Sequence, residues 1–268
     1  MTLSIQALIG ADSGSCIAVV GAGGKTTLCW RLIQEARQHD QRVLFTTTTK
    51  IWEPAPHAFD LSVPHQTVAQ TLRTLQASRW RTAGVFGDGA SAGIINHQPV
   101  ANSWMPVITT KRSGLSGEDI CQLRQALPDV CFVIEADGAR GLMLKAPGAD
   151  EPVIPACADF VCVLAQLDAL GRPLNAQTVH RAERFAHLTG LAHGAPITPA
   201  AMIAALTHPL GGLKSIPTHA RAIAVLTQTD SSAPHPAAHA IMQALVKHGY
   251  QRALNLAPRA HEPVLLWL

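Results

Sequence analysis

The sequence lacks any apolar run of the ~18 residues that a membrane-spanning helix requires. Its first residues do not form a basic segment followed by an uninterrupted apolar stretch, which a secretory signal peptide would show. Charged residues make up only 15% of the chain, the net charge is +3, and no basic stripe is present. These absences predict a cytoplasmic protein that binds neither a membrane nor nucleic acid.

Paired metal-ligand motifs are also missing, although the chain has six cysteines and thirteen histidines. No CxxC, HExxH or Cys/His knuckle occurs, and the histidines fall mostly in expected loops and at element ends. Scattered cysteines are typical of buried thiols in a reducing compartment. We expect this of all six, which are Cys16, Cys29, Cys121, Cys131, Cys157 and Cys162.

Short apolar runs alternate with segments of helical spacing, as in parallel strands joined by helices. Buried strands are predicted at 16–20, 43–45, 130–134, 160–165 and 222–226. Helices are predicted at 25–39, 66–77, 118–127, 178–188, 199–207 and 237–248. We expect one P-loop NTPase-like α/β domain over 1–268, with a mostly parallel sheet and helices on both faces. Prolines and glycines indicate a loop-rich insertion at about 52–112.

The run from Val19 to Thr27 joins the first strand to the first helix and reads VVGAGGKTT. Glycines allow backbone N–H groups to approach phosphates, a lysine reaches the β and γ oxygens, and a threonine hydroxyl ligates Mg²⁺. Val19 stands where the common GxxxxGK[ST] pattern has its first glycine, so the loop is a short variant that resembles the one in Mur ligases. The predicted nucleotide contacts are Gly21, Ala22, Gly23, Gly24, Lys25, Thr26 and Thr27.

Two acidic residues, Glu135 and Asp137, follow the strand at 130–134. A phosphate loop needs an acidic group at the end of a neighbouring strand to hold Mg²⁺ directly or through water. We expect at least one of them to join Thr26 in the metal sphere, and Lys25, Glu135 and Asp137 to carry the chemistry. The alternative is that one carboxylate caps the strand or pairs with Arg140.

A base-reading element is suggested by Thr227, Gln228 and Asp230 after the strand at 222–226. GTPases read guanine with [NT]KxD at such a strand end, so this pattern favours GTP over ATP; an ordinary polar turn explains it equally well. The run from Thr46 to Lys50 also follows a strand, at the edge where open α/β folds bind ligands. Thr48 and Lys50 there are candidates for contact with the γ-phosphate, Mg²⁺ or a second substrate.

Together these segments resemble the YqeC family, whose members are named as accessory proteins of selenium-dependent molybdenum hydroxylases or as selenium cofactor biosynthesis proteins. Met143 departs from the expected family pattern, which has proline there. The resemblance implies a role in maturing the molybdenum cofactor, with a molybdenum hydroxylase or a cofactor-maturation protein as partner. It also suggests a second site at Lys145, Glu151, His180 and Arg181. Arg140 is a further candidate, because the segment from Arg140 to Glu151 would bind an acceptor. The matching segments are 20–28, 46–51, 135–141, 144–147, 151–155 and 179–181.

Three functions are compatible with these patterns. The leading one is a Mg²⁺-dependent NTPase that hydrolyses GTP or ATP, with catalysis by electrostatic positioning of the phosphates. The second is a kinase, nucleotidyltransferase or ligase that activates a small acceptor. The third is a chaperone whose shape is gated by nucleotide without turnover.

Overall fold

The computed structural model describes residues 4–55, 57–92, 110–230, 232–260 and 264–268. The helices are α1 Ile5–Ile9, α2 Lys25–Gln38, α3 Val68–Ala77, α4 Gly117–Ala126, α5 Ala182–Thr189, α6 Pro199–Thr207 and α7 Ala238–Lys247, with a 3-10 helix at Leu167–Ala169. The strands are β1 Cys16–Gly21, β2 Val43–Thr47, β3 Ile51–Trp52, β4 Leu61–His65, β5 Thr82–Ala92, β6 Thr110–Ser113, β7 Cys131–Glu135, β8 Leu144–Lys145, β9 Phe160–Gln166, β10 Val179–His180, β11 Arg221–Thr227, β12 Arg252–Leu256 and β13 Val264–Trp267.

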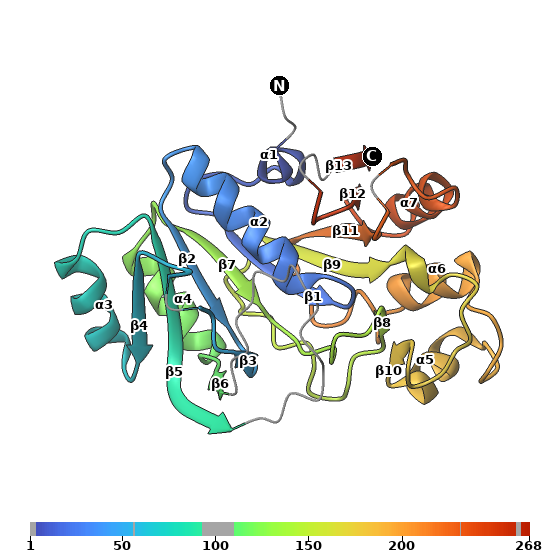
Figure 1. The fold of residues 1–268 in the computed structure, drawn as a ribbon, viewed down its shortest axis with the longest axis horizontal. Helices are drawn as coiled ribbons and strands as arrows, with labels where there is room; N and C mark the ends of the chain where they lie inside the picture. The colour runs from blue at the N-terminus through green and yellow to red at the C-terminus, as the bar shows by residue number, and fades with distance from the viewer. Residues whose placement is uncertain (1–3, 56, 93–109, 231, 261–263) are drawn as a thin grey trace.

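An eleven-stranded sheet runs through the centre of the molecule in the order β13-β12-β11-β9-β1-β7-β2-β5-β6-β3, with β4 paired to β5 (Figure 1). The strands from β12 through β1 to β5 pair in parallel, whereas β13, β6 and β3 pair antiparallel at the two sides. β8 and β10 form a separate parallel pair. The predicted α/β class and mostly parallel sheet are therefore confirmed.

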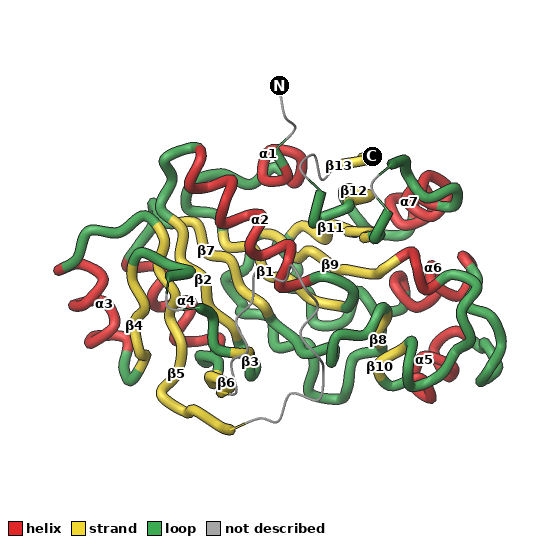
Figure 2. Tube along the Cα trace, viewed as in Figure 1, coloured by secondary structure: helices red, strands yellow, loops and turns green. Residues whose placement is uncertain are grey.

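Two hydrophobic cores lie on opposite faces of this sheet, because successive side chains of a strand point to opposite sides. Ile17 and Val19 pack with α1 and α2, whereas Cys16, Ala18 and Val20 belong to the core that α3 to α7 cover. The helices in Figure 2 thus lie on both faces of the strands. In the described part of the chain, none of these helices has the length and apolar character needed to cross a membrane.

The predicted strands and most predicted helices are present, with ends that differ by a few residues. The helix predicted at 178–188 is wrong at its start, because Val179 and His180 form β10 and α5 begins at Ala182. Ser116 caps α4 as its spacing indicates, since its hydroxyl accepts the Asp119 N–H at 3.0 Å. Within the insertion predicted to be loop-rich, residues 84–92 are not a loop, because they belong to β5. Gly84 does not make a turn there; a Cβ at this position would lie 2.5 Å from the ring of Phe59, so the glycine makes room for packing.

The stretch from 52 to 112 contains β4, α3, β5 and most of β6, and these strands belong to the main sheet. Residues 93–109 of this stretch lie outside the described residues. The structure therefore assigns the described part of the stretch to regular elements that extend the β2 side of the sheet.

The expectation of six free thiols is wrong for one pair, since Cys121 of α4 and Cys157 form a disulfide. They are 36 residues apart, and only the packing of α4 beside the loop before β9 brings them together. The other four cysteines are free and buried. Burial raises the pKa of Cys16, Cys131 and Cys162 to about 12, so these thiols are inert at neutral pH.

Candidate functional site

The loop between β1 and α2 lies where the parallel strands β7, β1 and β9 all end. We call residues 21–27, which the sequence predicts to bind phosphate, the phosphate loop. Gly21, Gly23 and Gly24 have φ values of +91°, +81° and +111°, which side-chain-bearing residues rarely adopt. A Cβ on Gly21 would overlap the carbonyl oxygen of Leu164, and one on Gly23 would lie 2.5 Å from Cβ of Gln166. Gly24 provides no side-chain cap for the first amides of α2, and uncapped amides at a helix start are suited to an anion.

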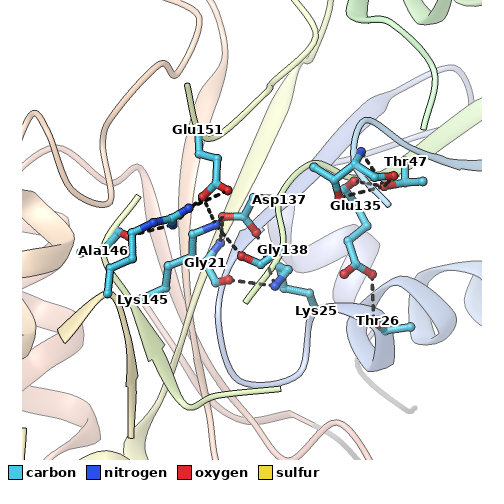
Figure 3. A network of polar contacts seen from close by, with 12 residues as sticks. Gly21, Lys25, Thr26, Thr47, Glu135, Asp137, Gly138, Lys145, Ala146 and Glu151 are labelled. Carbon is cyan, nitrogen blue, oxygen red and sulfur yellow. Dashed lines mark hydrogen bonds and ion pairs between the residues drawn. The ribbon is translucent and has the colours of Figure 1, made fainter. Parts of the chain in front are cut away.

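Lys25 begins α2 and is almost fully buried over this loop, with 6% of it exposed. Its Nζ donates to the carbonyl oxygen of Gly21 at 2.9 Å and lies 3.4 Å from Oδ1 of Asp137. Asp137 is also tied to the loop, because its Oδ2 accepts the Gly21 N–H at 3.0 Å. Figure 3 shows Asp137 between Lys25 and Lys145. The carboxylate thus holds both the loop backbone and the ammonium group that would meet phosphate.

Glu135 contacts the same loop from the end of β7. Its Oε2 accepts the hydroxyl proton of Thr26 at 2.8 Å (Figure 3). Burial raises the pKa of Glu135 above its ordinary value, and the nearby Asp137 adds to this, although Lys25 and Thr26 act in the opposite direction. A buried carboxylate in this state gains stability from a divalent cation.

The residues present fit Mg²⁺ by their chemistry. The hydroxyl oxygen of Thr26 and Oε2 of Glu135 lie 2.8 Å apart, so one cation could bind both. The buried Oδ1 of Asp137 makes no hydrogen bond. Within the described ranges, no three His, Cys, Asp or Glu side chains converge as a protein-only metal site. At a phosphate loop that binds Mg²⁺, phosphate oxygens and water supply most of the ligands.

Lys145 extends the site from β8. Its side chain is 1% exposed, and Nζ contacts Asp137 Oδ2 at 2.9 Å, Glu151 Oε2 at 2.6 Å and the carbonyl oxygen of Gly138 at 2.6 Å. Arg181 then binds both oxygens of Glu151, at 2.8 and 3.0 Å. We call the five alternating charges Lys25, Asp137, Lys145, Glu151 and Arg181 the charged chain.

Within the charged chain, Glu151 is an acidic residue whose pKa is strongly lowered by its neighbours. Burial opposes its ionisation, but hydrogen bonds from Arg181 and Lys145 lower its pKa to about 2. The hydrogen bonds to Glu151 raise the pKa of Arg181 in turn. The sequence predicts a second site at Lys145, Glu151 and Arg181. Asp137 links these residues to the phosphate loop, because it contacts both Lys145 and Lys25.

Arg140 and His180 lie beside the charged chain without belonging to it. Arg140 is exposed in the loop after Asp137, with φ +52°. His180 is half-buried on β10, in register with Lys145 on β8. Burial lowers the pKa of His180, and the charges of Arg181, Lys145 and Arg140 lower it further, against the effect of Glu151. The imidazole is therefore neutral near pH 7.

The threonine run after β2 has mainly structural contacts. The hydroxyls of Thr46, Thr47 and Thr48 donate to the carbonyl oxygens of Val85, Glu135 and Val153, at 2.8, 2.7 and 2.8 Å. Lys50 is exposed at the end of the run. Thr47 and Thr48 thus fasten β2 to β7 and to the loop that carries Glu151.

The loop after β11 touches the phosphate loop through Thr227, whose hydroxyl donates to the carbonyl oxygen of Gly23 at 2.5 Å. The Gln228 amide bonds within its own loop, donating to the carbonyl oxygens of Asp230 and Ala233 and accepting the His235 N–H. Asp230 is exposed, and its Oδ1 accepts the Ser232 N–H at 2.8 Å. Gln228 therefore shapes this loop, and Thr227 positions it.

Gln166 and Asp168, which the sequence reasoning missed, occupy the end of β9 beside this loop. Oδ2 of Asp168 accepts protons from Gln166 Nε2 at 2.6 Å and from both the N–H and hydroxyl of Thr229 at 2.9 Å. The available signal was their position directly after a predicted buried strand. Polar residues there lie at the ligand-binding edge of a parallel sheet.

A concavity of about 910 Å³ lies at the opposite end of the strands, near the starts of β2 and β5. Most of its charged side chains are already engaged: Arg81 pairs with Asp40, Arg42 stacks on Trp80, and Asp60 accepts backbone N–H groups, whereas Arg79 is exposed. It is also open to solvent and remote from the phosphate loop. We therefore place the functional site at the carboxyl ends of the strands.

Comparison with known proteins identifies the family to which this chain belongs. The YqeC protein family profile matches residues 17–183, which include the phosphate loop and all of the charged chain. The chain belongs to the YqeC family. It is similar to a protein of Escherichia coli (strain K12) named "Uncharacterized protein YqeC", with 30% identity over 238 residues that cover 87% of this chain and 83% of that protein. No solved structure matches the chain.

Proposed function

We propose that this protein binds ATP or GTP with Mg²⁺ at the loop from Gly21 to Thr27 and hydrolyses it as a P-loop NTPase. The observation that carries this proposal is the position of Lys25, buried over a glycine loop and held there by a neighbouring strand's Asp137. A buried ammonium at a helix start, next to outward-facing amides, is suited to a polyphosphate.

The residues divide the work by position. Lys25 leaves the carbonyl oxygen of Gly21 for the β and γ oxygens, while Asp137 continues to hold the Gly21 N–H and Lys145. Thr26 and Glu135 hold the metal, which supplies positive charge to the phosphates when bound. This assigns the metal role to Glu135 and the positioning role to Asp137. The rate gain comes from charge stabilisation by the fixed groups around the γ-phosphate.

The place of this activity in the cell rests on the family resemblance. We propose an accessory role in maturing a selenium-dependent molybdenum hydroxylase, in the cytoplasm, with the hydroxylase or another maturation protein as partner. Supporting data would be co-purification with a hydroxylase that depends on the nucleotide. Equal co-purification with and without nucleotide contradicts a nucleotide-gated partnership.

Substitution of Lys25 tests the nucleotide site. Lys25→Ala is expected to weaken binding of fluorescent ATP and GTP analogues at least 100-fold while circular dichroism shows a folded protein. Lys247→Ala, which changes an exposed lysine at the end of α7, is the matched control and retains wild-type affinity. Unchanged affinity in Lys25→Ala contradicts the proposal. Release of free phosphate by wild type distinguishes hydrolysis from group transfer and from a chaperone without turnover.

A further inference from the structure

Two polar side chains beside the phosphate loop have no partner in the described part of the chain. Neither the guanidinium of Arg140 nor the imidazole of His180 makes a hydrogen bond or an ion pair there. Their neighbours differ, because Lys145 and Arg181 each face a carboxylate. Arg140 and His180 are therefore the residues of this region that remain available for a ligand.

The segments that carry both residues are tied to the phosphate loop. Residues in register on a parallel pair point to the same face, so His180 lies on the side from which Lys145 reaches Asp137. The loop that carries Arg140 is fixed at both ends, by Asp137 and by the bond from Lys145 to the carbonyl oxygen of Gly138. Its continuation packs on the phosphate loop, since a Cβ on Gly23 would lie 3.1 Å from the carbonyl oxygen of Met143.

The charges around this place favour an anion. Arg140 has no carboxylate partner among the described residues, and Lys214 donates only to the carbonyl oxygens of Gly148 and Ala149. Burial and the surrounding cations lower the pKa of His180, so its neutral ring offers one N–H donor. A guanidinium binds two oxygens of a carboxylate or phosphate at once.

We infer that a small acidic acceptor, carrying a carboxylate or a phosphate group, binds beside the phosphate loop against Arg140 and His180. This inference rests on the proposed nucleotide function, and it narrows the second site. Lys145, Glu151 and Arg181 position the loops of the acceptor site by binding one another. Thr48 serves the fold through its bond to Val153.

The test is a calorimetric titration of the full chain saturated with Mg²⁺ and a non-hydrolysable ATP or GTP analogue, so that the phosphate loop is filled. Malonate and inorganic phosphate are the two probes. Wild type is expected to bind one of them, and the tighter probe identifies the acidic group of the acceptor. Arg140→Glu and His180→Ala are expected to weaken that probe at least tenfold while nucleotide affinity stays within twofold.

Two further variants sharpen the result. Arg140→Lys keeps the charge but loses the bidentate contact. Its affinity for the acid probe is therefore expected to lie between those of wild type and Arg140→Glu. Arg73→Ala removes an exposed arginine on α3, at the far side of the molecule from β8 and β10, and behaves as wild type (Figure 1).

Failure of the inference and failure of the nucleotide proposal give different results. If wild type binds the analogue but neither acid, or if Arg140→Glu and His180→Ala bind the acid as Arg73→Ala does, the inference is wrong and the nucleotide proposal stands. If wild type does not bind the analogue, the nucleotide proposal is wrong and the inference falls with it.

Discussion

The two sides of the phosphate loop are built from different interactions. On the β7 side, buried ionised groups contact one another, as Lys25, Asp137 and Lys145 do. On the β11 side, most contacts are hydrogen bonds of hydroxyl and amide groups, such as Thr227 to Gly23 and Gln228 within its own loop, and among the described residues the carboxylate of Asp168 accepts hydrogen bonds from Thr229 rather than pairing with a cation. Both sides lie at the carboxyl ends of parallel strands, so the sheet alone does not account for the difference.

The difference has a physical meaning for ligand binding. Buried charges are expensive unless paired, so a site that keeps them has a use for them, and phosphate with a metal ion is such a use. Neutral hydrogen bonds discriminate shape and donor pattern with little dependence on salt. We therefore expect phosphate and Mg²⁺ on the β7 side and the nucleoside on the β11 side.

The largest expected loss of stability comes from removing the charge of Asp137, which contacts both lysines of the β7 side. Asp137→Asn leaves two buried ammonium groups without their shared carboxylate, which costs about 3–5 kcal/mol of unfolding free energy. Asp230→Asn, an exposed acidic residue of the β11 side, is expected to cost less than about 0.5 kcal/mol. Urea denaturation of the two variants measures both values. Similar losses in both would show that the two sides do not differ in this way.

Acid provides a second test, directed at the outer part of the charged chain. Glu151 has a folded pKa of about 2 against an ordinary value of 4.5, so its stabilising effect is present above pH 4.5 and is lost as pH falls to about 2. Because its side chain is 25% exposed, we expect about 1–2 kcal/mol after solvent screening. Wild type and Glu151→Gln should differ at pH 7 and converge near pH 2; a difference that does not change with pH contradicts the role of this charge.

Gln228 tests the β11 side. Gln228→Ala removes three hydrogen bonds within the loop, partly replaced by water, so a loss of about 1–2 kcal/mol is expected. The ratio of GTP to ATP affinity should stay unchanged, because the amide is directed into its own loop. In Asp230→Ala, by contrast, a loss confined to GTP would identify Asp230 as the base reader. A changed ratio in Gln228→Ala with full stability would contradict the structural role.

Glu135 gives a small effect on stability, and one of opposite sign. Burial raises its folded pKa, so its favourable contribution to stability is present below its unfolded pKa and is lost as pH rises through the folded value. At pH 7.5, Glu135→Gln should therefore raise the unfolding free energy by up to about 1 kcal/mol, as at other functional sites. The same variant should lose the Mg²⁺ dependence of nucleotide binding. A less stable variant with intact Mg²⁺ dependence would exclude Glu135 from the metal sphere.

Much of the fold could be predicted because the relevant signals are local. An apolar run ended by glycines and followed by helical spacing describes β1, the loop and α2 within one stretch of 25 residues, 16 to 40. β5 could not be predicted in the same way, since its glycines serve packing against Phe59, a residue on another segment. The pairing of Cys121 with Cys157 was hidden for the same reason.

The sequence by itself determined which residues are candidates for binding phosphate and its metal: the glycines, Lys25 and Thr26 follow β1, and the two carboxylates lie at the end of β7, so both sets are given by spacing along single strands and their loops. Only the tertiary structure decided which of these residues contact one another. It placed Lys145 against Asp137, assigned Gln228 to its own loop and, among the described residues, left Arg140 and His180 without a hydrogen bond or ion pair. The physical reason is that backbone conformation responds to neighbouring residues, whereas an ion pair depends on distances between segments that only packing brings together.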